Sequence, residues 1–491
     1  MGIIRQQTIK GSVYSYLGAV LGFINVGILM PKLLTTDQYG LTSILVAISN
    51  LFAQFSSLGF NSVINRLFPY FRSEKEKHHG FFLLLILVGT VGFLISLVGF
   101  FSTQSFLVDR YSEQSALLVD YIYYLPLIIL ATLFFGLWDN YNKALFDAVS
   151  GILFKEFFTR ILIFLAVVAF GVGVVNFSGF VFLYVMALCS PAILMIATLL
   201  KRNQVSLGAE WGFIGRRFLK IIVSVAIYGL LAGMGNMAVI TIDKIMVNDM
   251  LGLSSTGVYS IAFYFGTLII LPSRALKKIA TTVIAEAWKR KDMVTIQKVY
   301  RETGFNQSLL AFLLFVGIWA NVGNIFTFLP PEYSAGKYVI LFIGLVNVLD
   351  MMAGVSSVIV LNSPKFRMQT LFLLILISCI VFSNLLFIPI WGMTGAAVAS
   401  LVSVVVFHTI KYLYLLKVFG LKQFDRRYLG ALGIAIVSYT ANLLLPQFDN
   451  FIFDIIVRSA LIGTIFVGFV LLSKLVPDLN AFLKSQLAKF F

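Results

Sequence analysis

The chain is a succession of long apolar runs separated by short polar stretches. An α-helix needs about 20 mostly apolar residues to cross the hydrocarbon core of a bilayer. Runs of this kind predict fourteen membrane-spanning helices, near residues 12–34, 40–70, 80–102, 117–142, 149–172, 177–200, 218–241, 256–286, 304–329, 336–361, 368–389, 393–417, 428–446 and 452–473. Backbone inside lipid must satisfy its own hydrogen bonds, which helices do. The expected fold is therefore an all-α integral membrane protein of about 14 transmembrane helices.

A short pattern occurs twice, half a chain apart. "DQYGLTS" spans Asp37–Ser43 and a looser copy, "SSTGVYS", spans Ser254–Ser260, so that Gly40 aligns with Gly257, 217 positions later. Weaker matches elsewhere have nearly the same offset. We interpret helices one to six and seven to twelve as two pseudo-symmetric six-helix lobes, since internal repeats of this kind are common in transporters. Each lobe has an even number of helices, so both have the same orientation, and the pseudo-twofold axis runs along the membrane normal.

These repeats predict the domain organisation. The first six-helix lobe is expected at residues 1–203, and a cytoplasmic linker at 204–217. The second lobe is expected at 218–424, and an additional helix pair with a cytoplasmic tail at 425–491. The last two helices have no counterpart in the first lobe, so they lie outside the repeat.

The composition agrees with a membrane protein. Hydrophobic residues make up 59% of the chain and charged residues 12%, with a mean hydropathy of +0.96, whereas soluble domains contain about 25% charged residues. With both termini placed inside, only five cations fall on the outer face: Lys32, Arg110, Lys244, Lys337 and Arg458. This asymmetry is a strong positive-inside signal and predicts cytoplasmic termini in the cytoplasmic membrane. The net charge of +16 is explained by these inner loops, so no nucleic-acid partner is needed.

No motif for a cofactor or a metal is visible in the sequence. Both cysteines, Cys189 and Cys379, fall in predicted spans, and the three histidines are scattered. These numbers indicate neither a disulfide framework nor a metal cluster.

Five motifs carry a resemblance to a known family. They are "YG" at Tyr39–Gly40, "IDKIMV" at Ile242–Val247, "TGVYSIA" at Thr256–Ala262, "PPEYSAG" at Pro330–Gly336 and "GMTGAAVAS" at Gly392–Ser400. With them and with its fourteen predicted helices, the chain resembles flippases of the polysaccharide transport (PST) family in the multidrug/oligosaccharidyl-lipid/polysaccharide (MOP) exporter superfamily. None of the five motifs is a catalytic signature, so they identify a scaffold better than a substrate.

The resemblance implies a MOP/MATE-like fold and a transport function without enzymatic activity. Family members move lipid-linked oligosaccharides from the inner to the outer leaflet by alternating access, for cell-surface polysaccharides such as O-antigen. The implied partners are an undecaprenyl-type lipid-linked oligosaccharide, the lipid bilayer and other polysaccharide assembly proteins, with a proton or a sodium ion as the candidate coupling ion. In related lipid II flippases, the extra helix pair shapes a groove for the lipid tail.

Ionisable residues inside a membrane are costly, which makes them candidates for function. Helices two and eight are repeat partners, and both carry cations toward the inner side. Such cations hold a diphosphate by charge-assisted hydrogen bonds if they face a cavity. The candidates for substrate binding, with amides at membrane depth, are Arg66, Arg274, Lys277, Asn25, Asn61 and Asn236. The structural alternative is that Lys277 extends to the cytoplasmic interface.

Four further residues are candidates for coupling or gating. Asp139 and Asp350 are either coupling-ion sites or partners of a nearby cation. Asp243 and Lys244 lie near the outer end of helix seven and, as sequence neighbours, on different helix faces. We expect them to make gate or interface contacts.

Two other functions remain open for the sequence. The first is a MATE-like cation-coupled exporter of drugs or metabolites, although such proteins usually have twelve helices and anionic cavities. The second, of a different class, is a membrane polysaccharide polymerase or ligase. Such enzymes usually carry catalytic groups on a large extracytoplasmic loop, and the outer loops predicted here are short.

Overall fold

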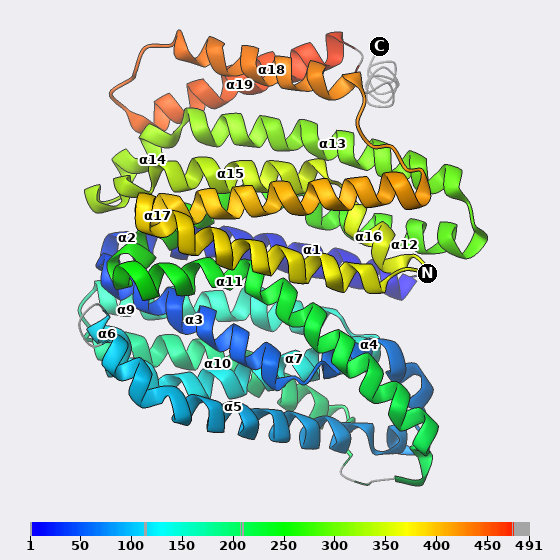
Figure 1. Ribbon diagram of the computed structural model, residues 1–491. Coiled ribbons are helices and arrows are strands. Elements are labelled where there is room, and N and C mark those ends of the chain that lie inside the picture. The colour runs from blue at the N-terminus through cyan, green and yellow to red at the C-terminus, as the bar shows by residue number, and fades with distance from the viewer. Residues whose placement is uncertain (1, 112–114, 207, 209–210, 474, 476–491) are drawn as a thin grey trace. The chain divides into compact units, whose positions relative to one another are not determined.

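The polypeptide folds into helices joined by short turns (Figure 1). The computed structural model describes residues 2–111, 115–206, 208, 211–473 and 475, and no β-strand occurs among them. The chain forms two compact units, unit 1 at Met1–Ser260 and unit 2 at Ile261–Phe491.

Unit 1 holds the first ten α-helices and most of the eleventh. They are α1 (Gly2–Gly22), α2 (Met30–Leu33), α3 (Thr36–Ser56), α4 (Phe60–Phe71), α5 (Phe81–Tyr111), α6 (Ala116–Tyr121), α7 (Leu125–Ala144), α8 (Val149–Ile152), α9 (Thr159–Gly171), α10 (Phe177–Lys201) and α11 (Arg216–Thr267). Two π-helical turns, η1 (Phe23–Leu29) and η4 (Leu153–Phe158), continue α1 and α8. Short 3₁₀ turns lie at η2 (Lys77–Gly80), η3 (Ile122–Tyr124) and η5 (Trp211–Phe213).

Unit 2 begins within α11 and contains the remaining helices. They are α12 (Ser273–Arg290), α13 (Met293–Ala320), α14 (Val322–Phe328), α15 (Lys337–Met352), α16 (Ser356–Asn362), α17 (Arg367–Phe419), α18 (Arg426–Leu443) and α19 (Phe451–Leu472). The 3₁₀ turns η6 (Leu268–Ile270) and η7 (Pro331–Gly336) precede α12 and α15.

Side-chain caps fix where several helices begin. Thr35 and Gln38 form a reciprocal capping box at the start of α3. Asn176 caps α10, Asp292 caps α13 and Asn450 caps α19, each by accepting a backbone N–H of the first turn. Such caps satisfy N–H groups that the helix itself leaves without partners.

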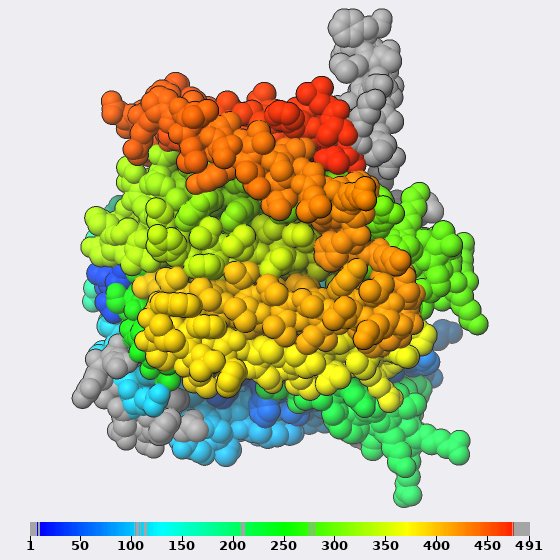
Figure 2. Space-filling model, turned by 45° about the horizontal axis from the view of Figure 1, so that its top comes forward, coloured from blue at the N-terminus to red at the C-terminus, as the bar shows by residue number. Residues whose placement is uncertain are grey.

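The two longest helices are each divided by a glycine. Gly252 within α11 has φ 82° and Gly392 within α17 has φ 57°, in the left-handed region that glycine adopts without a steric cost. In α17, the Ser403 hydroxyl donates to the Ser383 hydroxyl over 3.4 Å, so the segments before and after Gly392 lie antiparallel. Figure 2 shows them as adjacent yellow and orange bands.

In unit 1, α7 packs against α10, α3 and α4. Four fully buried aromatic side chains, Phe68, Phe71, Phe81 and Tyr141, join α4, α5 and α7. The rings of Phe68 and Tyr141 meet edge to face at 5.2 Å, and those of Phe71 and Phe81 lie 4.7 Å apart. This cluster stabilises the end of α7 that carries its polar residues.

In unit 2, α13 packs against α15, α18 and α19. These helices share one apolar core, whose buried members include Phe305, Leu309, Phe312, Tyr428, Ile434, Ile462 and Phe466. The helix pair α18–α19, predicted to lie outside the repeat, is thus an integral part of the core of unit 2.

A buried charge also anchors α19. Asp454 is 1% exposed. Its carboxylate accepts hydrogen bonds of 2.5 Å from Arg458 Nε and from the amide of Asn324, and one of 3.2 Å from the Phe448 N–H. The contacts connect α19 to α14 and to the turn that precedes α19.

Several predicted helices have different limits in the structure. The prediction of one helix at 40–70 is wrong, because Leu58 and Gly59 adopt φ 46° and 73° and separate α3 from α4. The helix expected at 336–361 is likewise broken, at Gly354 with φ 56°. The first segment of α11 continues past residue 241 to Gly252, and α13 begins at Met293 rather than 304. Hydropathy reports apolar content only, so it gives neither the breaks at Gly59 and Gly354 nor the polar helical turns at 242–252 and 293–303.

The described residues include ten helices that are long and apolar enough to cross a membrane. Two of them, spanning 55 and 53 residues, contain the dividing glycines of α11 and α17. The all-α membrane fold is therefore confirmed, and the number of fourteen helices stays a prediction.

Loss of the buried charge at the start of α19 should destabilise unit 2. The substitution Asp454→Ala leaves the half-buried Arg458 without its carboxylate, and breaking such a pair costs about 3 kcal/mol, so we expect a lower melting temperature of the purified protein in detergent. The matched control is Asp449→Ala, because Asp449 lies exposed in the same turn. Equal melting temperatures for the two variants would contradict a stabilising role for Asp454.

Candidate functional site

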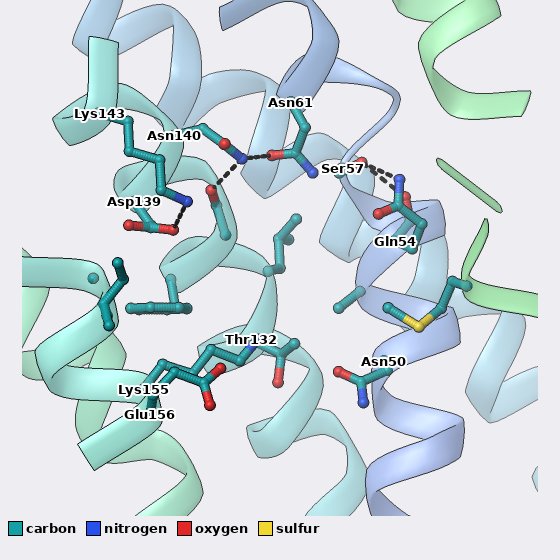
Figure 3. Close-up of a pocket in the computed structure, with 17 residues that line it drawn as sticks. Asn50, Gln54, Ser57, Asn61, Thr132, Asp139, Asn140, Lys143, Lys155 and Glu156 are labelled. Atoms are coloured by element: carbon teal, nitrogen blue, oxygen red, sulfur yellow. Dashed lines mark hydrogen bonds and ion pairs between the residues drawn. The ribbon is translucent and has the colours of Figure 1, made fainter. Parts of the chain in front are cut away.

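A polar chamber of about 340 Å³ lies inside unit 1, between α3, α4, α7 and the α8–η4 segment (Figure 3). Its polar lining consists of Asn50, Gln54, Ser57, Asn61, Thr132, Asp139, Asn140, Lys143, Lys155 and Glu156. A polar cavity of this kind among apolar helices is costly to build, and it is therefore a candidate binding site.

The chamber has two chemically different walls. Asn50 and Gln54 project from α3 on one side, and Asp139, Lys155 and Glu156 lie on the other (Figure 3). One wall thus offers neutral amides, which donate and accept hydrogen bonds, and the other wall carries charges.

Asp139 and Lys143 form an ion pair on α7. They are four residues apart, so both side chains project from one helix face. Asp139 is 9% exposed, and its Oδ1 has no hydrogen-bond partner among the described residues. This oxygen lies directly against Gly151 on α8, where a Cβ atom would occupy its position. Glycine at position 151 therefore leaves room for the Asp139 carboxylate, which a larger residue would displace.

The charged wall carries two carboxylates, Asp139 and Glu156, and two ammonium groups, Lys143 and Lys155. Glu156 accepts a hydrogen bond of 3.0 Å from Arg160, one helical turn later, so its charge is offset. The Lys155 ammonium lies 5.6 Å from the centroid of the Phe135 ring, and no carboxylate pairs with it within the part of the chain that the structure describes. Lys155 lines the chamber, is exposed, and has no carboxylate partner among the described residues.

Separate hydrogen bonds order the amides on α7, on α4 and at the end of α3. The Asn140 amide donates to Asn61 Oδ1 over 3.0 Å and to the Gly136 carbonyl over 2.9 Å. Gln54 donates to the Ser57 hydroxyl over 3.4 Å. These bonds orient the amides at the junction of α3 and α4, where the chain is broken at Gly59.

Contacts of Asp147 hold the turn between α7 and α8, which carry the two parts of the charged wall. Asp147 pairs with Arg202 at 2.5 Å and accepts hydrogen bonds from the hydroxyl and the N–H of Ser150. Burial alone would raise the pKa of Asp147, but the bonds from Ser150 and Arg202 outweigh it and hold the pKa below its usual value. The ionised carboxylate therefore caps α8 and positions Gly151.

Unit 2 contains a related charge cluster. Asp350 lies near the C-terminal end of α15 and accepts a hydrogen bond of 2.7 Å from Lys277 on α12. His408 on α17 lies 3.5 Å from the other oxygen of Asp350. Lys411, one turn later, is fully buried and donates to the Ser357 hydroxyl over 2.7 Å. Asp350 is thus the common partner of Lys277 and His408.

The remaining candidates for substrate binding lie elsewhere. Asn25 is buried in η1 and donates to the Arg160 carbonyl over 2.7 Å, which attaches η1 to α9. Arg66 is exposed on α4 and Asn236 is exposed on α11, and neither lines the chamber. Arg274 belongs to α12, but its side chain lies outside the described residues.

Asp243 and Lys244 lie inside α11, more than two helical turns before Gly252. Asp243 is buried and accepts a hydrogen bond of 3.0 Å from the hydroxyl of Tyr259. This bond joins the two segments of α11. The role of both residues in gating stays a prediction.

Sequence reasoning missed several charged residues of these clusters. Lys155 and Glu156 fall in the apolar run at 149–172, and His408 and Lys411 fall in the run at 393–417. A complete list of ionisable residues within each predicted span would have included all four. Lys143 was missed because it follows the end of the run at 117–142.

A family comparison identifies the chain. Residues 4–285 match the family described as polysaccharide biosynthesis protein. The chain belongs to this family. No curated protein matches the sequence.

The fold is shared with solved transporter structures. The structure of the lipid II flippase MurJ in an inward closed conformation covers 96% of this chain and 100% of its own, with a TM-score of 0.77 and 11% identity. An inward-facing multidrug resistance MATE family transporter of the MOP superfamily covers 83% and 96%, with a TM-score of 0.62 and 14% identity. A MOP superfamily transporter from Pyrococcus furiosus covers 83% and 94%, with a TM-score of 0.56 and 14% identity. These matches confirm the MOP/MATE-like fold that the resemblance implied.

The contact between Gly151 and Asp139 predicts a selective effect of an added methyl group. Gly151→Ala overpacks the charged wall, which costs about 1–3 kcal/mol, so we expect a lower melting temperature of the purified protein. Gly136→Ala is the matched control, since Gly136 also lines the chamber and a Cβ there meets open space. A melting temperature for Gly151→Ala as high as for Gly136→Ala would show that the wall tolerates the methyl group.

Proposed function

We propose that this protein is a flippase that moves lipid-linked oligosaccharides from the inner to the outer leaflet of the cytoplasmic membrane, for cell-surface polysaccharide biosynthesis. Membership of the polysaccharide biosynthesis family and a fold shared with a lipid II flippase support the proposal. The observation that carries it is the chamber of unit 1, whose lining combines an amide wall with Lys155, a lysine without a carboxylate partner among the described residues.

The chamber matches the chemistry of such a substrate. A lipid-linked oligosaccharide has an anionic diphosphate, a polar glycan and a long apolar tail. The Lys155 ammonium is suited to the diphosphate, because charge-assisted hydrogen bonds are stronger than neutral ones. Asn50, Gln54 and Asn61 are suited to sugar hydroxyls, which both donate and accept. We assign the head group to this chamber rather than to Arg66, which lies outside the lining.

Two observations favour a flippase over a drug exporter. The lining charges are balanced and Lys155 has no carboxylate partner among the described residues, so the chamber is not the anionic cavity that attracts cationic compounds. In addition, the flippase structure covers 96% of this chain and the MATE structure covers 83%. The flippase structure therefore shares more of its fold with this chain than the MATE structure does.

The transport cycle that we propose is alternating access by two six-helix lobes, at 1–203 and 218–424. The distribution of lysine and arginine supports cytoplasmic termini, with the chamber toward the cytoplasmic ends of its helices. Asp139 and Asp350 remain candidates for coupling to a proton or a sodium ion. Each already pairs with a lysine, so an arriving anion that attracts the lysine would free the carboxylate.

Neutralising Lys155 should impair transport. In Lys155→Gln, the head group loses a charge-assisted hydrogen bond, and we expect the flipping rate to fall about tenfold. The rate is measured in proteoliposomes with a fluorescent short-chain polyprenyl diphosphate-linked oligosaccharide, from the fraction that an impermeant quencher reaches.

The control is Lys289→Gln, which removes an exposed lysine of α12 and should transport at the wild-type rate. An unchanged rate in Lys155→Gln would remove Lys155 from the site. Wild-type protein that moves a cationic dye but not the glycolipid would favour an exporter, and glycosidic bonds made or broken in the liposomes would favour an enzyme.

A further inference from the structure

Helices α3 and α11 meet at a reciprocal pair of glycines within unit 1. A Cβ atom on Gly40 would collide with the carbonyl oxygen of Leu253, and one on Gly257 would collide with the carbonyl oxygen of Thr36. Each Cβ would also lie 3.2 Å from the backbone nitrogen of the opposite glycine. The two backbones are therefore in direct contact, with no side chain between them.

The residues on the two sides of the contact are separated by the offset of the sequence repeat. Gly257 follows Gly40 by 217 positions, and Leu253 follows Thr36 by the same number. A contact in which two residues exchange the same partners is the signature of a twofold axis. The contact agrees with a pseudo-twofold axis of the predicted repeat that passes between Gly40 and Gly257. The similar segments at 37–43 in α3 and 254–260 in α11 are both helical and build the two sides of this contact.

Polar contacts surround the glycine pair. The hydroxyls of Thr36 and Ser254 lie 2.8 Å apart. Near the end of α5, Arg110 binds Asp249 of α11 through two hydrogen bonds of 2.5 and 2.8 Å. All of these residues lie at the helix ends that the distribution of lysine and arginine places outside.

The contact and the chamber occupy different levels of the same helix. Gly40 lies in the second turn of α3, and the first chamber residue of α3, Asn50, follows ten positions later. At 1.5 Å per residue, the glycine contact lies about 15 Å from that level of the chamber. An occupant of the chamber that leaves through the outer side must pass this level.

We infer that the Gly40–Gly257 contact is the outer seal of the transport pathway, closed in this conformation and broken whenever the chamber opens outward. This inference rests on the proposed function. Backbones in direct contact leave no space for a sugar. In this conformation both glycines belong to unit 1, whereas the proposed transport cycle assigns α3 and α11 to different lobes, so the outward-open state of that cycle requires this contact to break. The ion pair of Arg110 and Asp249 strengthens the closed state and is released with it.

A disulfide across the seal tests this role. Thr36→Cys and Ser254→Cys are introduced together in a background with Cys189→Ala and Cys379→Ala. We expect an oxidant to crosslink this pair and to abolish flipping of the fluorescent oligosaccharide glycolipid. A reductant should restore the rate.

The matched control is a disulfide within one lobe. The hydroxyls of Ser56 on α3 and Ser96 on α5 lie 2.6 Å apart, so Ser56→Cys with Ser96→Cys should crosslink without loss of transport. A Thr36–Ser254 pair that fails to crosslink, or that transports equally well when crosslinked, would overturn the inference. Absence of transport by the wild-type protein would instead refute the proposed function, and the crosslinking yield would still test the contact.

A second variant tests the seal without transport. In Gly40→Ala, the methyl group keeps the two backbones apart, so a single Ser254→Cys should react faster with a membrane-impermeant maleimide in lipid nanodiscs. The comparison variant is Gly99→Ala on α5, where a Cβ meets open space. Equal reaction rates in the two backgrounds would contradict a closed seal at Gly40.

Discussion

The structure depends on one electrostatic constraint: a charge among apolar helices needs a partner, because its desolvation costs several kcal/mol. Each unit meets this constraint at a similar position. Asp139 near the end of α7 pairs with Lys143, and Asp350 near the end of α15 pairs with Lys277. The pairs hold the polar ends of these helices at low net charge. Lys155 differs from these residues because it is exposed and has no carboxylate partner among the described residues, and the proposed function assigns the anionic head group to it.

Helix breaks and close helix contacts frame the proposed transport pathway. The break at Gly59 separates α3 from α4, and chamber residues lie on both sides of it. At the opposite end of α3, Gly40 lets two backbones meet and excludes solvent without any side chain. A site built from amides and charges, about 15 Å below a seal built from glycines, is the arrangement that alternating access requires. The lobes can then separate at the seal while the chamber keeps its internal bonds.

The sequence predicted the fold better than the site. Hydropathy reports which runs face lipid, so the helices and the membrane class were predicted, and the repeat offset gave Gly40 its partner. The chamber was predicted only in part, through Asp139 and Asn61. Which face of an apolar helix meets a cavity depends on its neighbours, and hydropathy contains no such information. Arg66 was therefore chosen for its charge although it lies outside the lining, and Lys155 was passed over in a run that is otherwise apolar.

The central claim is that unit 1 binds the head group of a lipid-linked oligosaccharide in its chamber. A structure determined by electron cryo-microscopy with a short-chain polyprenyl diphosphate-linked oligosaccharide tests it most directly. The account predicts a phosphate oxygen within hydrogen-bond distance of Lys155 Nζ and a sugar against Asn50 and Gln54. A head group bound outside this chamber, with Lys155 in contact with solvent alone, would contradict it.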